Sequence, residues 1–450
     1  MLREFYDRIA TTPSSPSREF IIAGYTYGEV YRLAANICML HKTSACDSEA
    51  ICLCTTDKAL IAAALLASLH GGPRIIIPYS FSRQALQDTR ETMAFSKILS
   101  DSKEISCPDT EIITPVMLSG TSHLPEYRRH PDEPFVTLFT GGSTGKSKLW
   151  SKTPRNLFGE ALYLCHEFGL TSDDIIISTV PPQHIYGLLF SVLLPFISSC
   201  KLLPELYTFP REILEAINKY NASILVSVPP HYRVLKIDNL QKCSLRMAFS
   251  SAGILNKNDA DFFYLKTGID ITEIYGSTET GGVATRQRLV DGETWKSFDI
   301  VDWKIKNKRL HVRSDFLSPE LPRDEAGFFM TADRVKPEGK KRFTLSGRID
   351  DIVKVGGKRV DLVDVQKKIK QIPGVRDAVV FTIPARNGRE NDIAAMVAGN
   401  ITVSQLRLCL GEVNEPYAIP RHFSIVDSIP VTPTGKYDRT LIEQIFHKRQ

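Results

Sequence analysis

Short apolar runs alternate with longer segments of helical length through the first two-thirds of the chain. The runs are rich in Ile, Leu, Val and Phe, which is typical of buried strands, and the longer segments are apolar or amphipathic. Strands are predicted at 50–54, 74–78, 97–99, 135–139, 174–180, 223–227, 247–250 and 271–274, and helices at 58–69, 82–94, 154–168, 187–198 and 211–220. This alternation predicts an α/β fold in which parallel-rich sheets are packed with helices.

The pattern changes near residue 294, where short β-like runs with dense charge between them predict a small β subdomain. After Asp350 a new α+β pattern begins. Its predicted elements are helices at 360–371 and 404–412 and strands at 376–383 and 422–426. A segment of about 100 residues with its own pattern predicts a separate small domain. We therefore expect an N-terminal domain at 1–349 and a C-terminal domain at 350–450.

Composition and charge narrow the class of protein. The chain has 450 residues with 43% hydrophobic and 24% charged content, which is ordinary for a soluble globular protein. A net charge of +5 suits an anionic ligand such as ATP, coenzyme A or an acidic carrier protein, and it does not favour nucleic acid. The nine cysteines are scattered and form no C-x-x-C pair, which favours reduced, mostly buried thiols.

Neither a secretory signal nor a membrane span is expected from the sequence. The first residues carry mixed charge without a long apolar core. The longest apolar stretch, 59–69, is too short to cross a bilayer. We therefore expect a soluble, cytoplasmic protein.

The segment 140–148 directly follows a predicted strand and combines glycines, hydroxyl side chains and two lysines. Such a loop can direct backbone N–H groups, hydroxyls and positive charge at a polyphosphate. Its end, Gly145-Lys146-Ser147, fits a Walker loop, but Thr140 stands where the first glycine of that motif belongs. A Walker-type hydrolase or kinase and a plain surface turn stay open as alternatives.

Three later segments carry further candidate chemistry. Residues 274–281 offer an aromatic ring, hydroxyls and one carboxylate, which suits a nucleotide with magnesium, although an ordinary β-turn would look similar. Asp333 and Arg348 could bind two ribose hydroxyls, or belong to a charged hairpin. Lys436 lies on a Pro- and Gly-stiffened loop that could hold a cation near developing negative charge, or simply be solvated.

Taken in order, these segments resemble the adenylate-forming (AMP-binding) superfamily, which includes acyl-CoA synthetases, aryl-CoA ligases, luciferases and peptide-synthetase adenylation domains. The resemblance covers nearly the whole chain. It implies that Tyr275 stacks on adenine and that Asp333, helped by Arg348, holds the ribose. The ATP-binding residues that it implies are Thr140, Gly142, Ser143, Thr144, Gly145, Lys146, Lys148, Ser251, Ala252, Gly253, Tyr275, Gly276, Asp333 and Arg348.

The resemblance also implies catalytic roles. Lys436 would bridge the substrate carboxylate and ATP, Thr278 would contact the α-phosphate, and Glu279 would hold Mg²⁺. His184 would line the acyl pocket, although a lone histidine can be structural. Asp350 would be the hinge of a mobile C-terminal domain. The implied thiol tunnel consists of Lys354, Gly356 and Gly357.

Departures from the family pattern leave every implied catalytic group in place. Gly141 replaces a common serine, Ser147 a common proline and Leu149 a common glycine, and Ala332 stands where a glycine usually precedes the ribose aspartate. The chain is also shorter than most members of the superfamily.

The reaction implied by this resemblance is ATP-dependent activation of a carboxylic acid through an acyl-adenylate. The acyl group would then pass to a thiol of coenzyme A or of a carrier-protein phosphopantetheine. Tyr186 and Phe190 suggest an apolar site for an aryl or fatty acid, and the segment 183–186 has no acidic residue to pair with an amino acid's ammonium group. Amino-acid adenylation and a non-catalytic family member stay as alternatives, and the presence of both Lys436 and Glu279 disfavours the second.

Overall fold

The computed structural model describes residues 9, 15–41, 50–102, 104–118, 123–140, 148–235, 244–349, 351–355, 358–384, 391–432 and 435–448. The chain forms two compact units. Unit 1 comprises Met1–Asp302 and Arg313–Phe329, and unit 2 comprises Trp303–Val312 and Met330–Gln450. Most of the predicted β subdomain thus groups with the C-terminal part. Asp350 lies outside the described residues, and the boundary at 349/350 and the hinge there stay predictions.

The first sheet of unit 1 has the strand order β4-β3-β1-β2-β5-β6. Neighbouring strands from β4 to β5 are parallel, and β6 alone runs antiparallel to its neighbour β5. The strands are β1 (Ala50–Leu53), β2 (Arg74–Ile77), β3 (Phe95–Leu99), β4 (Glu111–Ile113), β5 (Val136–Thr140) and β6 (Lys148–Lys152), and the helices near them are α2 (Tyr27–Cys38), α3 (Lys58–Leu69), α4 (Arg83–Thr92) and α5 (Pro154–Glu167), with short 3-10 turns η1 (Met39–His41) and η2 (Pro115–Met117).

The second sheet of unit 1 has the order β13-β12-β11-β10-β9-β7-β8. It is parallel from β8 to β11 and antiparallel from β11 to β13. The strands are β7 (Ile175–Ser178), β8 (Lys201–Leu202), β9 (Ile224–Ser227), β10 (Met247–Ser250), β11 (Thr272–Ser277), β12 (Gly281–Gln287) and β13 (Thr294–Ser297), and the helices are α6 (Ile185–Leu188), a π-helical turn η3 (Leu189–Leu193), α7 (Leu194–Ser198), α8 (Pro210–Tyr220), α9 (Pro229–Val234), α10 (Lys257–Thr267) and α11 (Arg288–Asp291).

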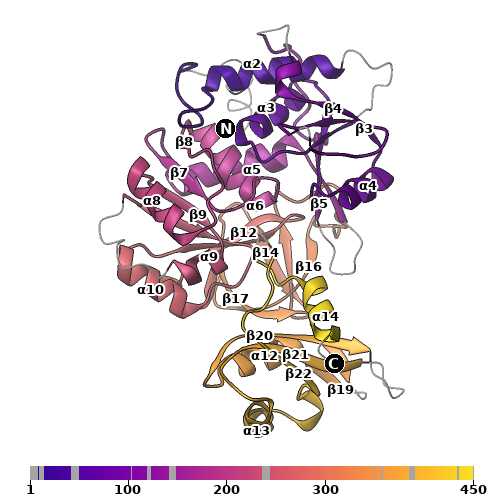
Figure 1. Cartoon of the computed structure of the whole chain (residues 1–450), viewed down its shortest axis with the longest axis vertical. Coiled ribbons are helices and arrows are strands. Elements are labelled where there is room, and N and C mark those ends of the chain that lie inside the picture. Colours follow the sequence, from indigo (N-terminus) through magenta and orange to yellow (C-terminus); the bar gives the residue numbers. More distant parts are fainter. Residues whose placement is uncertain are drawn as a thin grey trace. The chain divides into compact units, whose positions relative to one another are not determined.

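A layer of helices lies between the two sheets of unit 1 (Figure 1). Helix α3 contacts β2 of the first sheet, η3 contacts β7 of the second, and α3 and η3 contact each other. All twelve residues of α3 are buried, which matches its lack of a polar face. Its N-cap Asp57 accepts hydrogen bonds from the Ala59 and Leu60 N–H groups. The only charged residue of α3, Lys58, donates to the Leu203 carbonyl at 2.7 Å, and burial lowers its pKa to about 8.

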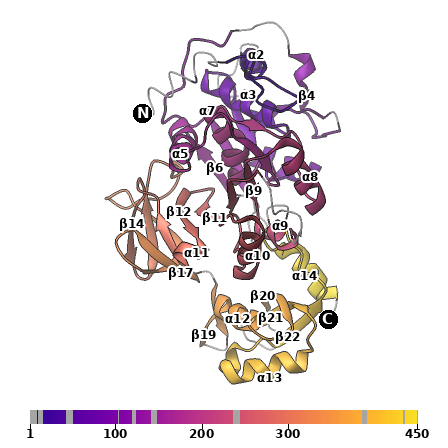
Figure 2. The same cartoon turned by 90° about the vertical axis from the view of Figure 1, so that its left-hand side faces the viewer.

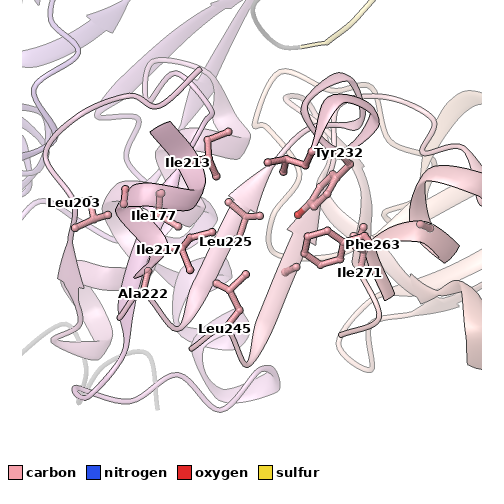
Figure 3. Close-up of a cluster of buried hydrophobic side chains, with 14 of the residues drawn as sticks. Ile177, Leu203, Ile213, Ile217, Ala222, Leu225, Tyr232, Leu245, Phe263 and Ile271 are labelled. Atoms are coloured by element: carbon pink, nitrogen blue, oxygen red, sulfur yellow. The ribbon is translucent and has the colours of Figure 1, made fainter. Parts of the chain in front are cut away.

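One face of the second sheet is covered by α8, α9 and α10 (Figure 3). Ile213 and Ile217 of α8 pack toward Ile177 of β7 and Leu225 of β9, and Phe263 of α10 belongs to the same buried cluster. Tyr232 of α9 also packs here, and its Oη donates to the Phe249 carbonyl at 2.8 Å. This bond fastens α9 to β10 and therefore fixes the residues next to Tyr232.

Unit 2 begins with a run of antiparallel strands and ends in a small α+β sandwich. In the sandwich, β20 pairs antiparallel with β21, and β21 pairs parallel with β22. Helices α12 and α13 pack on one face of this small sheet and α14 on the other (Figure 2). The elements are β14 (Asp302–Lys306), β15 (Arg309–Arg313), β16 (Phe329–Pro337), β17 (Arg342–Arg348), β18 (Ile352–Val355), β19 (Lys358–Asp361), α12 (Leu362–Lys370), β20 (Val375–Pro384), β21 (Asn391–Gly399), α13 (Val403–Val413), the 3-10 turn η4 (Pro416–Ala418), β22 (His422–Val426) and α14 (Arg439–Lys448).

The predicted fold class is confirmed, with local corrections. The expected helix at 360–371 is wrong at its start, because Val360 and Asp361 pair with β18 and α12 begins at Leu362. The expected helix at 187–198 is interrupted by η3. The segment 274–281, for which an ordinary β-turn was an alternative, comprises the end of β11, the turn at 278–280 and the first residue of β12. Among the described residues no helix is both long and apolar enough to span a bilayer.

Candidate active site

The described ends of the candidate phosphate loop belong to two neighbouring strands. Thr140 ends β5, Lys148 begins β6, and the two are paired across the ladder, with Thr140 Oγ1 donating to the Lys148 carbonyl at 3.4 Å. Gly142, Ser143, Thr144, Gly145 and Lys146 lie outside the described residues. A Walker loop leads from a strand into a helix whose N-terminus faces the phosphates. Here the loop leads into an antiparallel strand, which contradicts the Walker alternative.

The strand that leaves this loop ends in a buried cation. Lys152, the last residue of β6, is fully buried, and its Nζ donates to the Phe316 carbonyl at 3.3 Å. Burial lowers the pKa of this ammonium group to about 8, while the carboxylates of Glu160, Glu279 and Glu320 act in the opposite direction. Lys152, on the strand that follows the predicted phosphate loop, therefore interacts electrostatically with the predicted magnesium carboxylate of Glu279.

Glu160 on α5 is the buried carboxylate next to this cation. Its Oε1 accepts a hydrogen bond from the Gly282 N–H at 2.6 Å. Burial raises the pKa of the Glu160 carboxyl to about 7, against the effects of Lys152 and the Gly282 N–H. A Cβ atom at Gly281, where φ is +65°, would lie 2.6 Å from Glu160 Oε2, so only glycine fits there. Glu160 thus holds the first residues of β12 against α5.

The β11–β12 hairpin presents the candidate catalytic residues Thr278 and Glu279 in its turn. Ser277 and Thr280 close this turn, since their hydroxyls lie 2.9 Å apart and each hydroxyl accepts the other residue's N–H. The Glu279 carbonyl accepts from the Ser318 N–H at 2.9 Å. The turn is therefore held both by its own side chains and by segments distant in sequence.

Tyr275 and Gly276 lie in β11 rather than in a loop. The Tyr275 ring packs at 5.5 Å from the Trp295 ring at an angle of 52°. A Cβ atom at Gly276 would lie 2.3 Å from the Gly281 carbonyl oxygen, so the hairpin requires glycine at that position.

The segment Ser251, Ala252 and Gly253 follows β10, the neighbour of β11. Ser251 Oγ donates to the Ile274 carbonyl at 2.9 Å, one residue before Tyr275. Ala252 has a φ of +67°, which is uncommon for a residue other than glycine. The adenine-side residues predicted from two separate segments are thus brought together at the carboxyl ends of adjacent strands, where ligands of α/β sheets bind.

The half-buried Glu279 carboxylate suits a magnesium ion that is shared with ATP. Among the described residues no group of three or more His, Cys, Asp or Glu side chains could hold a metal ion by itself. Mg²⁺ is commonly held by one or two carboxylates together with substrate phosphates. A single carboxylate at Glu279, completed by the phosphates of ATP, fits that arrangement.

His184 precedes α6, and its N–H donates to the Pro181 carbonyl at 3.2 Å. Beyond it lies an aromatic cluster in which the Tyr186 and Phe190 rings are 5.0 Å apart and the Phe190 and Phe249 rings 5.0 Å apart. Phe168 joins this cluster at 4.8 Å from Phe249. The predicted apolar character of this region is therefore seen in the packing.

Sequence reasoning missed several residues, notably Lys152, Glu160, Phe168 and Phe249. For Glu160 a signal was available. It lies on the buried face of α5 with Leu157, Ala161 and Leu164, where an apolar residue is expected. A carboxylate at such a position indicates a specific buried partner.

Unit 2 holds the remaining predicted residues. Asp333 and Arg348 are paired across β16 and β17, with Arg348 Nη1 3.5 Å from Asp333 Oδ1, so the charged hairpin exists and also brings the predicted ribose residues together. Lys354 lies in β18, with only its backbone described, and Gly356 and Gly357 lie outside the described residues. Lys436 is exposed, and its carbonyl accepts from the Thr432 N–H at 2.7 Å.

The family model for AMP-binding enzymes matches residues 21–331. The chain belongs to the AMP-binding enzyme family. It is an acid–thiol ligase, which activates a carboxylic acid with ATP through an acyl-adenylate and passes the acyl group to a thiol. The resemblance predicted from the four motif segments is thereby confirmed.

Two curated relatives belong to the same class of ligase. A 2-succinylbenzoate–CoA ligase of Staphylococcus aureus (strain MSSA476) is 27% identical over 369 residues, 74% of this chain and 71% of its own length. The mitochondrial acyl-coenzyme A synthetase ACSM1 of Mus musculus is 25% identical over 351 residues, 68% of this chain and 61% of its own length.

Solved structures confirm the fold. ATP-bound MatB from Rhodopseudomonas palustris matches with a TM-score of 0.84 at 19% identity, covering 99% of both chains. The O-succinylbenzoate coenzyme A synthetase (MenE) of Bacillus subtilis in complex with AMP matches with a TM-score of 0.81 at 17% identity, covering 98% of this chain and 97% of its own.

Proposed function

We propose that this enzyme activates an aryl or fatty acid with ATP and Mg²⁺ and transfers it to coenzyme A or to a carrier-protein phosphopantetheine in the cytoplasm. The observation that carries the proposal is the junction of β6, α5 and the β11–β12 hairpin. Through Lys152 and Glu160 it links the segments predicted to contact phosphate and magnesium within one unit. The aryl substrate of the 2-succinylbenzoate–CoA ligases supports the same acid class.

In the first half-reaction a carboxylate oxygen of the acid attacks the α-phosphorus of ATP. A new P–O bond forms, the bond to the β-phosphate breaks, and pyrophosphate leaves. Thr278 contacts the α-phosphate, and Lys436 balances charge on the carboxylate and the α-phosphate as the transition state forms. Mg²⁺ at Glu279 supplies further positive charge to the phosphate oxygens when it is bound.

In the second half-reaction the thiol sulfur attacks the carbonyl carbon of the acyl-adenylate. A C–S bond forms, the bond to AMP breaks, and the thiol proton passes to solvent. We propose that the C-terminal domain turns about Asp350 between the two steps, so that Lys436 leaves and the segment with Lys354, Gly356 and Gly357 lines the thiol's path.

Amino-acid adenylation is the second candidate and has less support. An α-amino acid needs a carboxylate for its ammonium group, and the segment 183–186 supplies none. Glu273 on β11 is buried, but Arg286 binds it through two hydrogen bonds at 2.8 and 3.0 Å.

The test is a pyrophosphate-release screen across aryl, fatty and amino acids, run with and without coenzyme A and phosphopantetheinylated carrier protein. We expect release that depends on an aryl or fatty acid, and thioester formation with one of the two acceptors. Release that ignores every carboxylic acid would contradict the proposal. Strict dependence on an amino acid would favour the second candidate.

A further inference from the structure

Three hydroxyl side chains form a row across the carboxyl ends of three adjacent parallel strands in unit 1. Thr179 follows β7, Ser227 ends β9 and Ser250 ends β10, and the strand order is β10-β9-β7. Ser250 and Ser227 are paired in register, and the Thr179 N–H donates to the Val226 carbonyl at 2.9 Å. All three residues are buried. Carboxyl ends of parallel strands are where α/β sheets bind their ligands.

His231 on α9 is joined to this row. Its Nδ1 lies 2.6 Å from Thr179 Oγ1, which in turn lies 2.8 Å from Ser227 Oγ. Tyr232, the next residue, anchors α9 to the Phe249 carbonyl, so the orientation of His231 is fixed. Its Nε2 has no hydrogen-bond partner among the described residues. A hydrogen-bonded, oriented imidazole with one nitrogen still available can bind a polar group of a ligand.

Two polar atoms without partners belong to this row or lie beside it. Ser250 Oγ and Tyr186 Oη are buried and have no hydrogen-bond partner among the described residues. The Tyr186 phenol lies close to the Ser227 backbone without forming a hydrogen bond of normal geometry. Each buried, unpaired polar atom costs about 1–3 kcal/mol, so two of them at one hydroxyl row indicate a ligand that supplies partners.

The surroundings of His231 indicate a neutral partner rather than a charged one. Burial lowers the pKa of its imidazole, and no charged group contributes to that shift. Glu273 lies beside Ser250 in the β10–β11 register, but it is already paired with Arg286. A neutral imidazole can donate or accept a hydrogen bond, which suits a hydroxyl group.

We propose that His231 is a specificity residue of the acid site and that the acid carries a neutral hydrogen-bonding group, such as a phenolic hydroxyl on an aromatic ring. The inference rests on the proposed function and narrows its acid class. The aromatic rings of Tyr186, Phe190 and Phe249 provide the apolar surface, and His231 with its hydroxyl row provides the polar contact. An unsubstituted fatty acid would leave these buried polar groups unpaired.

The test measures ATP–pyrophosphate exchange for matched acids: benzoate with 3- and 4-hydroxybenzoate, cinnamate with 4-hydroxycinnamate, and hexanoate. We expect kcat/KM for at least one hydroxylated acid to exceed that of its unsubstituted partner at least tenfold, because a site built to bind a hydroxyl rejects the analogue that lacks it. Equal rates for every hydroxylated acid and its partner would overturn the inference. Exchange with no acid at all would instead overturn the proposed function, and this inference with it.

Variants then assign the preference to His231. His231→Phe should reduce the ratio of kcat/KM for the hydroxylated acid to that for the unsubstituted acid about tenfold or more, with little change in KM for ATP. His231→Gln keeps a neutral hydrogen-bonding group and should retain part of the preference, and it decides the question if His231→Phe does not fold. The matched control is His166→Gln at an exposed position of α5. An equal loss for all acids in both His231 variants would show a merely structural role.

Discussion

The turn that carries Glu279 and the turn that carries Lys436 are held in different ways. The first is closed by Ser277 and Thr280 and is also fastened by Glu160 and Ser318, which are distant in sequence. The second is closed by local backbone hydrogen bonds at Thr432, and its lysine is exposed. The Lys436 ammonium group has no hydrogen bond or ion pair with any described residue.

This difference separates two kinds of site residue. The position of Glu279 depends on the buried groups Glu160 and Lys152, which support its turn. Substitutions of these groups should therefore disturb Glu279 although they do not contact the substrate. The Lys436 side chain supports no other described residue, so its loss should lower the reaction rate and leave the free energy of unfolding unchanged. The following experiments test this contrast.

The largest effect is expected for Lys436→Ala. Loss of one group that stabilises charge in the transition state costs about 10²–10³-fold in rate, and we expect that loss in acid-dependent ATP–pyrophosphate exchange. Thiol transfer from supplied acyl-adenylate should stay within a few-fold, and the unfolding midpoint should not move. Lys448→Ala, at an exposed position of α14, is the control. Equal loss in both half-reactions would contradict the assigned role.

The next largest effect is expected for Gly281→Ala, which creates a steric clash next to the turn that carries Glu279. Gly281→Ala places a Cβ atom 2.6 Å from Glu160 Oε2 and 2.7 Å from the Phe316 Cβ, at a φ of +65°. Gly268→Ala has a similar φ of +74° but meets no atom within 4 Å, so it measures backbone strain alone. We expect about 1 kcal/mol of destabilisation for Gly268→Ala and clearly more for Gly281→Ala in urea unfolding, with a loss of exchange activity only in the latter. Equal destabilisation would show that the contact with Glu160 is unimportant.

Removing only one member of the buried pair of Lys152 and Glu160 should lower the free energy of unfolding strongly. Removing both should lower it less. Glu160→Ala leaves the Gly282 N–H unpaired and Lys152 without its neighbouring carboxylate, and it should lower the free energy of unfolding by about 3 kcal/mol. Glu160→Gln keeps an acceptor for Gly282, and combined with Lys152→Met it should recover part of that loss. If the double variant is less stable than Glu160→Ala, the two charges do not compensate each other.

The smallest expected effect concerns how the free energy of unfolding depends on pH. The Lys152→Met, Glu160→Gln double variant should lose the part of this dependence that comes from the two buried groups. The pKa of Glu160 is raised from 4.5 to about 7, so between these values the unfolded state has released a proton that the folded state keeps. Its contribution to stability therefore falls as pH rises through that window. The pKa of Lys152 is lowered from 10.5 to about 8, so its contribution rises between pH 8 and 10.5.

The measurement is the difference in unfolding free energy between the wild type and the double variant from pH 5 to 10. We expect this difference to pass through a minimum near pH 7–8 and to change by about 2 kcal/mol across the range. A flat difference would mean that these two groups keep their ordinary pKa values in the folded protein.

Local sequence patterns predicted several elements well and failed where pairing is long-range. The helix at 58–69 was predicted with its observed bounds, because an apolar run and the Asp57 cap define it locally. Val360 and Asp361 continue a helical pattern, yet they pair with Val353 and Ile352 in β18. The strand predicted at 271–274 continues to Ser277, because β11 pairs with β12, a strand that was not predicted.

The sequence by itself determined the family and the chemistry, because the motif segments at 140–148, 274–281, 331–349 and 430–439 carry their residue types in a fixed order. It also determined most of the buried strands and helices, since an apolar segment must be buried irrespective of which element packs against it. Only the tertiary structure decided that Glu160 meets Gly282, 122 residues away, and that His231 meets Thr179, 52 residues away. Such contacts depend on how sheets and helices pack, and a buried polar group shows its partner only once that packing has excluded water.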